Sequence, residues 1–392
     1  MSGFTKHMYE KDVVEIERQL SVYVKELSAI LPLDYDFNSL VELIEEFYPY
    51  EFRVIKEKHE EYCILDRKII KMKGKARFNM QSPLEILENI PITKNILSDA
   101  YRQKYMEEFD LEDYAYKKEV IVRDRMPKIK KKKDKIDKAI AKTQQIEPQF
   151  LDELIGLYER KNTTQMDRVY IMLELQKYYC PKIIKFFKKR AHSELNFQLR
   201  EMAVLFLHSM GHYAVLRKQK YMQVHTNNRK KKKNLKQEYA KQKFNIRAIP
   251  NELEYRVNNN AMEQRLKSYD YFISHSSIDY ENVQKLIYEL NNKRKNVYCD
   301  WINDTDYLKR KLVCDATLMV IRKRIEQSKA IIWVESQESS DSIWVKYELN
   351  YAQRLNKPIY CINRDYVEDL SRMYKLSDYW FFDEKYEEVK LY

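Results

Sequence analysis

Two side chains that could act on a ligand, Trp344 and Glu348, lie in the segment SSDSIWVKYELNYAQRL at residues 339–355. The segment begins with residues that favour a helix start, and its apolar pattern is amphipathic. A spacing of four residues therefore places the Trp and the Glu on one helix face. A carboxylate on such a face is usually solvated, but beside a ligand it can stabilise positive charge or bind hydroxyl groups. The elements around this helix decide which role Glu348 has.

The chain from residue 268 onward alternates short apolar segments with amphipathic ones. Short strands separated by longer helices are typical of a parallel sheet with helices on its faces. The predicted strands are SYDYFISHSS, NVYCDWI, KAIIWVES and KPIYCI, with a possible edge strand DYWFFD at residues 378–383.

Ligands bind open parallel sheets beyond the carboxyl ends of the strands. That edge is predicted to carry Ser274 and His275 after the first strand and Asp300 after the second. The helix of Trp344 and Glu348 begins soon after the third strand, so topology alone predicts Glu348 near a ligand.

The same region resembles a Toll/interleukin-1 receptor (TIR) domain, which implies a flavodoxin-like α/β fold. The resemblance covers about a third of the chain. It rests on YDYFISHSSID, VYCDW, the helix before KAIIWVES, and the S-x-W-x-x-x-E-L pattern of Ser342, Trp344, Glu348 and Leu349. Many TIR domains of bacteria, plants and animal axons are NAD hydrolases or cyclases, and in that subset the Glu of W-x-x-x-E is catalytic.

The resemblance implies roles for particular residues. Glu348 would be catalytic, Trp344 would lie near the nicotinamide, and Tyr298 matches an aromatic residue that lines the pocket in relatives. His275 stands where the family often has Tyr. The substrate-binding residues would be Ser274, His275, Tyr298, Asp300 and Trp344.

Cleavage of the nicotinamide–ribose bond generates an oxocarbenium-like sugar, which a nearby carboxylate can stabilise. The nicotinamide of NAD is already cationic, so a general acid is not required. Water as acceptor gives ADP-ribose and an adenine nitrogen gives a cyclic product, and the sequence leaves both open. NAD is expected as a substrate, and neither a cofactor nor a metal ion is predicted, since no glycine-rich phosphate loop is present.

The preceding sequence is predicted to be helical. Its periodicity indicates an N-terminal helical domain at 1–125, a basic linker helix at 126–146 and a second helical domain at 147–250, followed by the TIR domain at 265–392. Short consecutive helices in the second domain are compatible with a HEAT-like stack or with a helical bundle.

Two basic runs accompany a net charge of +12. Such runs are usually solvated, but they permit an anionic partner such as nucleic acid. The candidate anion-binding residues are Lys130, Lys131, Lys132, Lys133, Arg229, Lys230, Lys231 and Lys232.

The N-terminus has no apolar signal core, no stretch is apolar enough to span a membrane, and the five cysteines form no CxxC pair. These features favour a cytoplasmic protein. The leading hypothesis is a TIR effector that self-assembles through its TIR domains when activated and depletes NAD, in antiphage defence. The alternatives are a non-catalytic TIR scaffold that signals by assembly and a protein that primarily binds nucleic acid.

Overall fold

The computed structural model describes residues 3–376, except 220–221, 223, 225, 247–248, 260, 306 and 309–313. The chain divides into two compact units. We call Met1–Asp137 with His208–Tyr213 the helical unit, and Lys138–Leu207 with Ala214–Tyr392 the mixed unit. The edge strand predicted at 378–383 lies outside the described residues.

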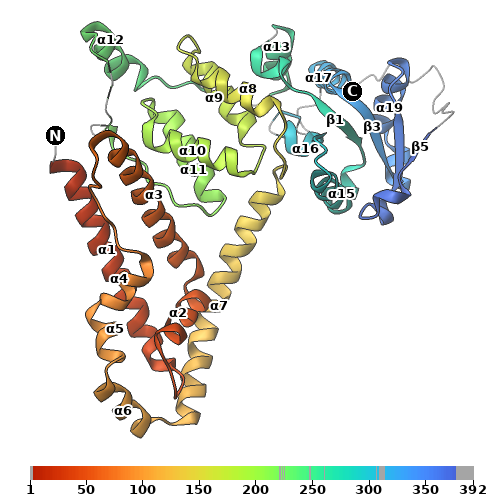
Figure 1. Ribbon diagram of the computed structural model, residues 1–392. Coiled ribbons are helices and arrows are strands. Elements are labelled where there is room, and N and C mark those ends of the chain that lie inside the picture. Colours follow the sequence, from red (N-terminus) through yellow and green to blue (C-terminus); the bar gives the residue numbers. More distant parts are fainter. Residues whose placement is uncertain are drawn as a thin grey trace. The chain divides into compact units, whose positions relative to one another are not determined.

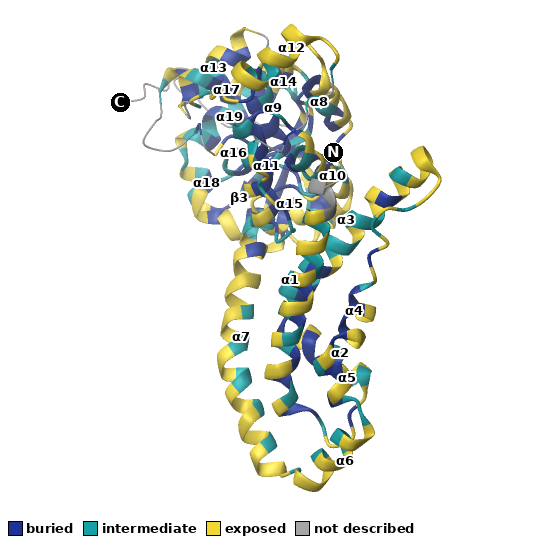
Figure 2. Cartoon of the chain, turned by 90° about the vertical axis from the view of Figure 1, so that its left-hand side faces the viewer, coloured by how far each residue is buried: buried dark blue, intermediate teal, exposed yellow. Residues whose placement is uncertain are grey.

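The helical unit is built from amphipathic helices, as predicted, and Figure 2 shows buried faces turned inward along α1 and α2. Ile16, Leu20, Val24 and Leu27 recur every three or four residues in α1 and are fully buried. The helices are α1 (Gly3–Leu27), α2 (Phe37–Phe47), α3 (Pro49–Lys73), α4 (Pro83–Asn89), α5 (Pro91–Ile96), α6 (Asp99–Glu108) and α7 (Leu111–Ala141).

The predicted linker helix at 126–146 is the C-terminal half of α7, which starts at Leu111 and contains Pro127 in its interior. A proline removes one helical hydrogen bond and usually ends or kinks a helix. Here Ile121, Val122 and Met126 pack against the core of the helical unit, and this packing holds the turns around the proline. The boundary predicted between residues 125 and 126 is therefore not a helix boundary.

A buried carboxylate closes the turn after α3. Asp66 accepts hydrogen bonds from the backbone N–H groups of Arg77, Phe78 and Asn79 at 2.8, 3.0 and 2.8 Å. Burial alone would raise the pKa of Asp66, but these three donors outweigh it and lower the pKa below the usual value.

Replacing Asp66 by Ala is expected to destabilise the helical unit by about 1–3 kcal/mol, because three backbone N–H groups lose their buried acceptor. The wild-type advantage should be present at neutral pH and disappear as the pH falls through the lowered pKa. Urea denaturation at several pH values measures it. Asp124→Ala, on the exposed face of α7, is the control, and an equal effect of both variants would contradict the prediction.

In the mixed unit, short helices precede the sheet, as expected for the second helical domain (Figure 1). They are α8 (Phe150–Glu159), α9 (Gln165–Leu175), α10 (Pro181–Ser193), α11 (Phe197–Ser209), α12 (Arg229–Asn234), α13 (Pro250–Asn258) and α14 (Met262–Arg265).

The sheet has the order β2-β1-β3-β4-β5, in which all pairs are parallel except the antiparallel pair β4–β5. Helix α15 packs on one face through Val283 and Leu286, and helices α17 and α19 pack on the other through Ile325 and Val345. The flavodoxin-like fold is thus confirmed. The elements are β1 (Tyr269–Ser274), α15 (Tyr280–Asn292), β2 (Val297–Tyr298), α16 (Asp300–Asn303), α17 (Asp315–Glu326), β3 (Ser328–Glu335), α18 (Gln337–Asp341), α19 (Ile343–Arg354), β4 (Ile359–Asn363) and β5 (Tyr374–Lys375).

The second strand is shorter than predicted. It ends at Tyr298, and α16 begins at Asp300, so the last three residues of the predicted NVYCDWI strand belong to a helical turn. The Asn303 side chain accepts a hydrogen bond from the backbone N–H of Cys299 at 2.9 Å and stabilises this turn. None of the described helices is long and apolar enough to cross a membrane.

Candidate active site

Glu348 lies on α19, whose start is capped as its sequence indicates. The Ser342 side chain accepts a hydrogen bond from the backbone N–H of Val345. Val345 and Leu349 are buried against the sheet and orient the helix. Between them on the helical surface, Glu348 reaches the end of β1, where the hydroxyl of Ser274 donates to its Oε2 at 2.5 Å. The predicted neighbours at the carboxyl edge are therefore in direct contact.

The surroundings of Glu348 favour its neutral form. The residue retains partial exposure, but protein atoms crowd its carboxyl group, and this burial raises its pKa to about 8. The hydrogen bond from Ser274 opposes the rise, and the charge of Asp300 adds to it. A carboxyl group with a raised pKa on a partly exposed residue is typical of active sites.

His275 and Asp300 lie together on the same edge. His275 Nε2 is 3.8 Å from Asp300 Oδ1, and its Nδ1 is 3.2 Å from the carbonyl oxygen of Ile273. The His275 side chain is almost buried, whereas half of the Asp300 side chain is exposed. This arrangement can offer one ring nitrogen and one carboxylate to a polar ligand beside Glu348.

Cys299 lies beside His275 and Asp300 on this edge. It was not among the predicted site residues. Its thiol is buried, and burial raises its pKa well above the usual value, with further contributions from the charges of Asp300 and Glu348. Within the described part of the chain, His275, Cys299 and Asp300 form the group whose donor atoms, all within 4.8 Å of one another, are close enough to hold a metal ion. The signal for Cys299 was its position directly before Asp300.

Arg364 was also missed by the sequence reasoning, although it directly follows β4 at the same carboxyl edge. Its guanidinium group lies 3.3 Å from Asp279 and 2.9 Å from Glu338. A half-exposed arginine at this edge is a candidate partner for a phosphate group.

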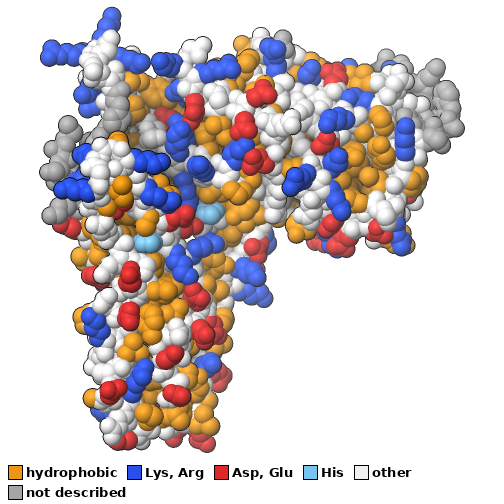
Figure 3. Space-filling view, viewed as in Figure 1, with side chains coloured by type: hydrophobic (Ala, Val, Ile, Leu, Met, Phe, Trp, Pro, Cys, Tyr) orange, Lys and Arg blue, Asp and Glu red, His pale blue; other side chains and the backbone are white. Residues whose placement is uncertain are grey.

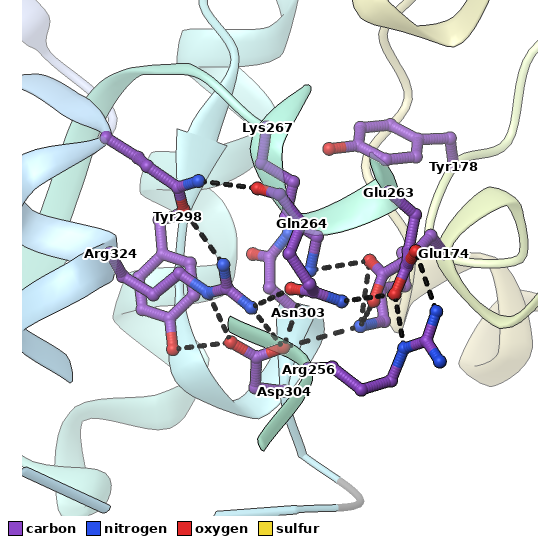
Figure 4. A network of polar contacts seen from close by, with 12 residues as sticks. Glu174, Tyr178, Arg256, Glu263, Gln264, Lys267, Tyr298, Asn303, Asp304 and Arg324 are labelled. Atoms are coloured by element: carbon purple, nitrogen blue, oxygen red, sulfur yellow. Dashed lines mark hydrogen bonds and ion pairs between the residues drawn. The ribbon is translucent and has the colours of Figure 1, made fainter. Parts of the chain in front are cut away.

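The two predicted aromatic residues differ in position. Trp344 is partly exposed and packs against the apolar cluster under α19. Tyr298 is fully buried, stacks on Phe272, and donates its hydroxyl to Asp304 at 3.1 Å (Figure 4). Its side chain thus belongs to the core, and the structure gives no contact between it and the Glu348 carboxylate.

A cavity of about 620 Å³ lies elsewhere in the mixed unit. Ser268, Asp270, Asn296 and Lys329 line it, and these residues stand at the amino ends of strands β1, β2 and β3. The cavity is therefore at the edge of the sheet opposite to Glu348.

The basic runs form two exposed stretches on separate helices. Lys130–Lys133 lie on α7 and Arg229–Lys232 on α12, and Figure 3 shows Lys and Arg side chains gathered over α12. Lys132 is 3.9 Å from Glu51 and also lies over the ring of Tyr50. Nucleic-acid binding by these stretches stays a prediction.

Glu348→Gln is expected to raise stability in a pH-dependent way. Folding shifts the pKa of Glu348 from 4.5 to about 8, so between these values the folded chain binds more protons than the unfolded chain. Wild-type stability therefore falls relative to the variant as the pH rises through this range. Melting temperatures should coincide near about pH 5 and favour the variant near about pH 8.5. The control is Glu368→Gln at an exposed position, and a difference that does not change with pH would contradict the prediction.

Comparison with known proteins identifies relatives of both parts of the chain. The family described as "Thoeris protein ThsB, TIR-like domain" matches residues 272–369. A Cytobacillus dafuensis protein named "Putative cyclic ADP-D-ribose synthase TIR2" is 35% identical over 363 residues, which cover 93% of this chain and 92% of the relative. A Bacillus cereus (strain MSX-D12) protein named "Probable 3' cyclic ADP-D-ribose synthase ThsB'" is 30% identical over 106 residues, which cover 26% of this chain and 54% of that protein.

No solved structure matches the chain significantly. The match to the Cytobacillus protein extends over nearly the full length of both chains, so it includes the helical regions as well as the sheet. The chain therefore belongs to the Thoeris TIR protein family, with a ThsB-type TIR-like domain at its C-terminal side.

Proposed function

We propose that this chain cleaves the nicotinamide–ribose bond of NAD and joins the ribose to an acceptor within the same molecule, which gives a cyclic ADP-ribose. The contact between Glu348 and Ser274 at the ligand edge carries the proposal. The names of both relatives, which refer to cyclic ADP-D-ribose synthases, support cyclisation over hydrolysis.

In this mechanism the bond between the ribose carbon and the nicotinamide nitrogen breaks, and its electron pair leaves with neutral nicotinamide. The positive charge moves to the ribose ring, where the ionised Glu348 stabilises it. With a pKa of about 8, Glu348 is largely protonated at neutral pH before substrate binds. A cationic nicotinamide ribose favours the ionised form and so drives the proton off.

The acceptor then determines the product. An adenine nitrogen attacks without losing a proton, whereas a ribose hydroxyl must give its proton to a base, and water would yield ADP-ribose. Ser274 keeps the Glu348 carboxylate oriented, while His275 and Asp300 bind polar groups of the substrate and Trp344 lies beside the nicotinamide. Tyr298 is left out of this set because it is buried with its hydroxyl on Asp304.

The proposal extends to the biological role. The enzyme acts after activation, with assembly through the TIR domains, and its depletion of NAD serves antiphage defence. The family relationship supports this part. The exposed basic stretches on α7 and α12 support a nucleic-acid or nucleoprotein partner as the trigger.

The test is induction of wild-type chain and Glu348→Ala in cells, with NAD and its products measured by mass spectrometry at matched protein levels. Loss of NAD with a cyclic product in the wild type alone is expected. Constant NAD under induction and phage challenge, with phage resistance that survives Glu348→Ala, would favour the non-catalytic scaffold instead.

A further inference from the structure

The turn that begins directly after Cys299 is held in part by residues outside the TIR-like domain. This turn, α16, spans Asp300–Asn303 and is followed by Asp304. Asp304 donates its backbone N–H to the carbonyl oxygen of Asp300 at 2.9 Å, and Asn303 does the same to Cys299 at 2.8 Å. These two hydrogen bonds link Asn303 and Asp304 directly to Cys299 and Asp300.

The first hold on this turn is a buried cluster of charges, shown in Figure 4. The Asp304 carboxylate, fully buried, accepts from Arg324 Nε of α17 at 2.8 Å. Lys177, just after α9, lies 3.5 Å from the same carboxylate, and Lys267, just after α14, lies 3.8 Å from it. Glu174 of α9 in turn pairs with Lys177 at 3.2 Å and Lys267 at 2.8 Å. The elements before the sheet thus provide two of the cations that surround Asp304.

The second hold is the buried side chain of Gln144. Its Oε1 accepts from the backbone N–H of Val297, and its Nε2 donates to the carbonyl oxygen of Val297 at 2.5 Å and to Asn303 Oδ1 at 3.4 Å. The amide group thus pairs with the outer edge of β2 as a neighbouring strand would. Gln144 is itself fixed, since its backbone bonds to Lys177 and Tyr179.

Both sets of contacts include residues that precede the sheet. The Gln144 amide contacts Asn303 in α16, and the lysines contact Asp304, the residue directly after α16. Buried ion pairs add little net stability on average, but they can specify one conformation. The charge cluster around Asp304 and the amide of Gln144 lie where they would fix the position of Cys299 and Asp300 relative to Glu348.

We infer that the helices before the sheet form a working part of the active site, in which Gln144, Lys177 and Asp304 are positioning residues that hold α16 opposite Glu348. In the activity measurements the inference rests on the proposed NAD cleavage. It assigns the α8–α14 part of the mixed unit a role in the chemistry, in addition to any role in sensing a partner.

The experiment compares full-length wild type with Gln144→Ala and Lys177→Met. The first variant removes the amide bonds to β2 and α16. The second removes one of three cations that face two carboxylates, so it leaves the cluster balanced and should fold. Tyr158→Phe is the matched control, because it removes another buried hydrogen bond, to Glu194 at 2.6 Å, in the α8–α14 part.

Both positioning variants should lower kcat on the order of 10-fold or more, since small misplacements within an active site are costly. The limb of the pH profile of kcat/KM that reports Glu348 should also move toward lower pH. Ser274 of β1 donates a hydrogen bond to Glu348, and the charge of Asp300 in α16 raises the pKa of Glu348. A looser α16 would weaken this charge interaction and let water reach the carboxyl group. The control should change neither quantity well below its melting temperature.

Hydrogen exchange of backbone amides 297–304 provides a readout that needs no activity. Faster exchange in Gln144→Ala and Lys177→Met, but not in Tyr158→Phe, would support the inference even if NAD is not the substrate. The inference would be overturned if amides 297–304 of Gln144→Ala and Lys177→Met exchange at the wild-type rate. It would also be overturned if both variants keep the wild-type kcat and pH profile.

Discussion

Glu348→Gln is expected to abolish NAD cleavage while leaving the protein folded. The amide keeps the size of the side chain and can still contact Ser274, but it cannot carry the negative charge that stabilises the ribose cation. Loss of a preorganised group of this kind lowers kcat by roughly 10²- to 10³-fold, so little nicotinamide release should remain. Release can be followed by chromatography, with circular dichroism to confirm the fold.

Two companion variants sharpen this prediction. Glu348→Asp keeps the charge but withdraws it by one methylene from Ser274, so it should retain partial activity. Glu338→Gln neutralises a half-exposed carboxylate on the neighbouring α18 and should retain most of the activity. If Glu338→Gln and Glu348→Gln lost the same amount of NAD-cleaving activity, the activity would depend on the total negative charge near this edge rather than on Glu348 itself.

Asp304→Asn is expected to destabilise the mixed unit by about 3–5 kcal/mol, the usual consequence of removing one partner from a buried ion pair. The variant would leave Arg324, Lys177 and Lys267 with Glu174 as the remaining carboxylate of the cluster. Burial alone would raise the pKa of Asp304, but Arg324 and the two lysines outweigh it and hold the pKa far below its usual value. The stability that Asp304 contributes is therefore present at neutral pH and lost on acidification.

Denaturant titration of the full chain measures this effect, with Asp270→Asn as control. Asp270 pairs with Lys329, whose side chain is largely exposed, so its loss should cost at most about 1 kcal/mol. Lys267→Met should also cost less than Asp304→Asn, because burial lowers the pKa of Lys267 to about 8 and the cluster has one cation more than it has carboxylates. Asp304→Asn with wild-type stability would contradict a structural role for the cluster.

The parts of the structure that depend on local pattern were predictable from the sequence. Strand and helix periods gave the parallel sheet, and the four-residue spacing on α19 together with the strand ends placed Glu348 near Ser274. The start of α19 at Ser342 follows from ordinary capping chemistry.

The parts that depend on contacts between distant residues were not predictable in this way. Tyr298 is one residue before Cys299, and on a strand adjacent side chains point to opposite faces, so a small change in where β2 ends decides which of them reaches the site. The Asp304 cluster joins Glu174 and Arg324, which no local period connects. The same holds for Gln144, whose partner Val297 lies far along the chain.

Stability and activity place opposite demands on Glu348. Burial beside Ser274 and Asp300 raises the pKa of Glu348 to about 8, so ionising this group disfavours the folded state. The proposed reaction nevertheless needs the ionised form. Functional sites commonly keep such unfavourable groups, and the surrounding structure compensates for them.

The most direct test of NAD cleavage at Glu348 is incubation of full-length protein with NAD in extracts of phage-challenged cells, where the protein is activated. The products are measured by mass spectrometry, with Glu348→Gln in parallel. We expect equal amounts of nicotinamide and a cyclic ADP-ribose from the wild type and neither from the variant. Nicotinamide release by Glu348→Gln at the wild-type rate would contradict a catalytic role of Glu348. NAD that stays intact with the wild-type protein under every activating condition would contradict NAD cleavage itself.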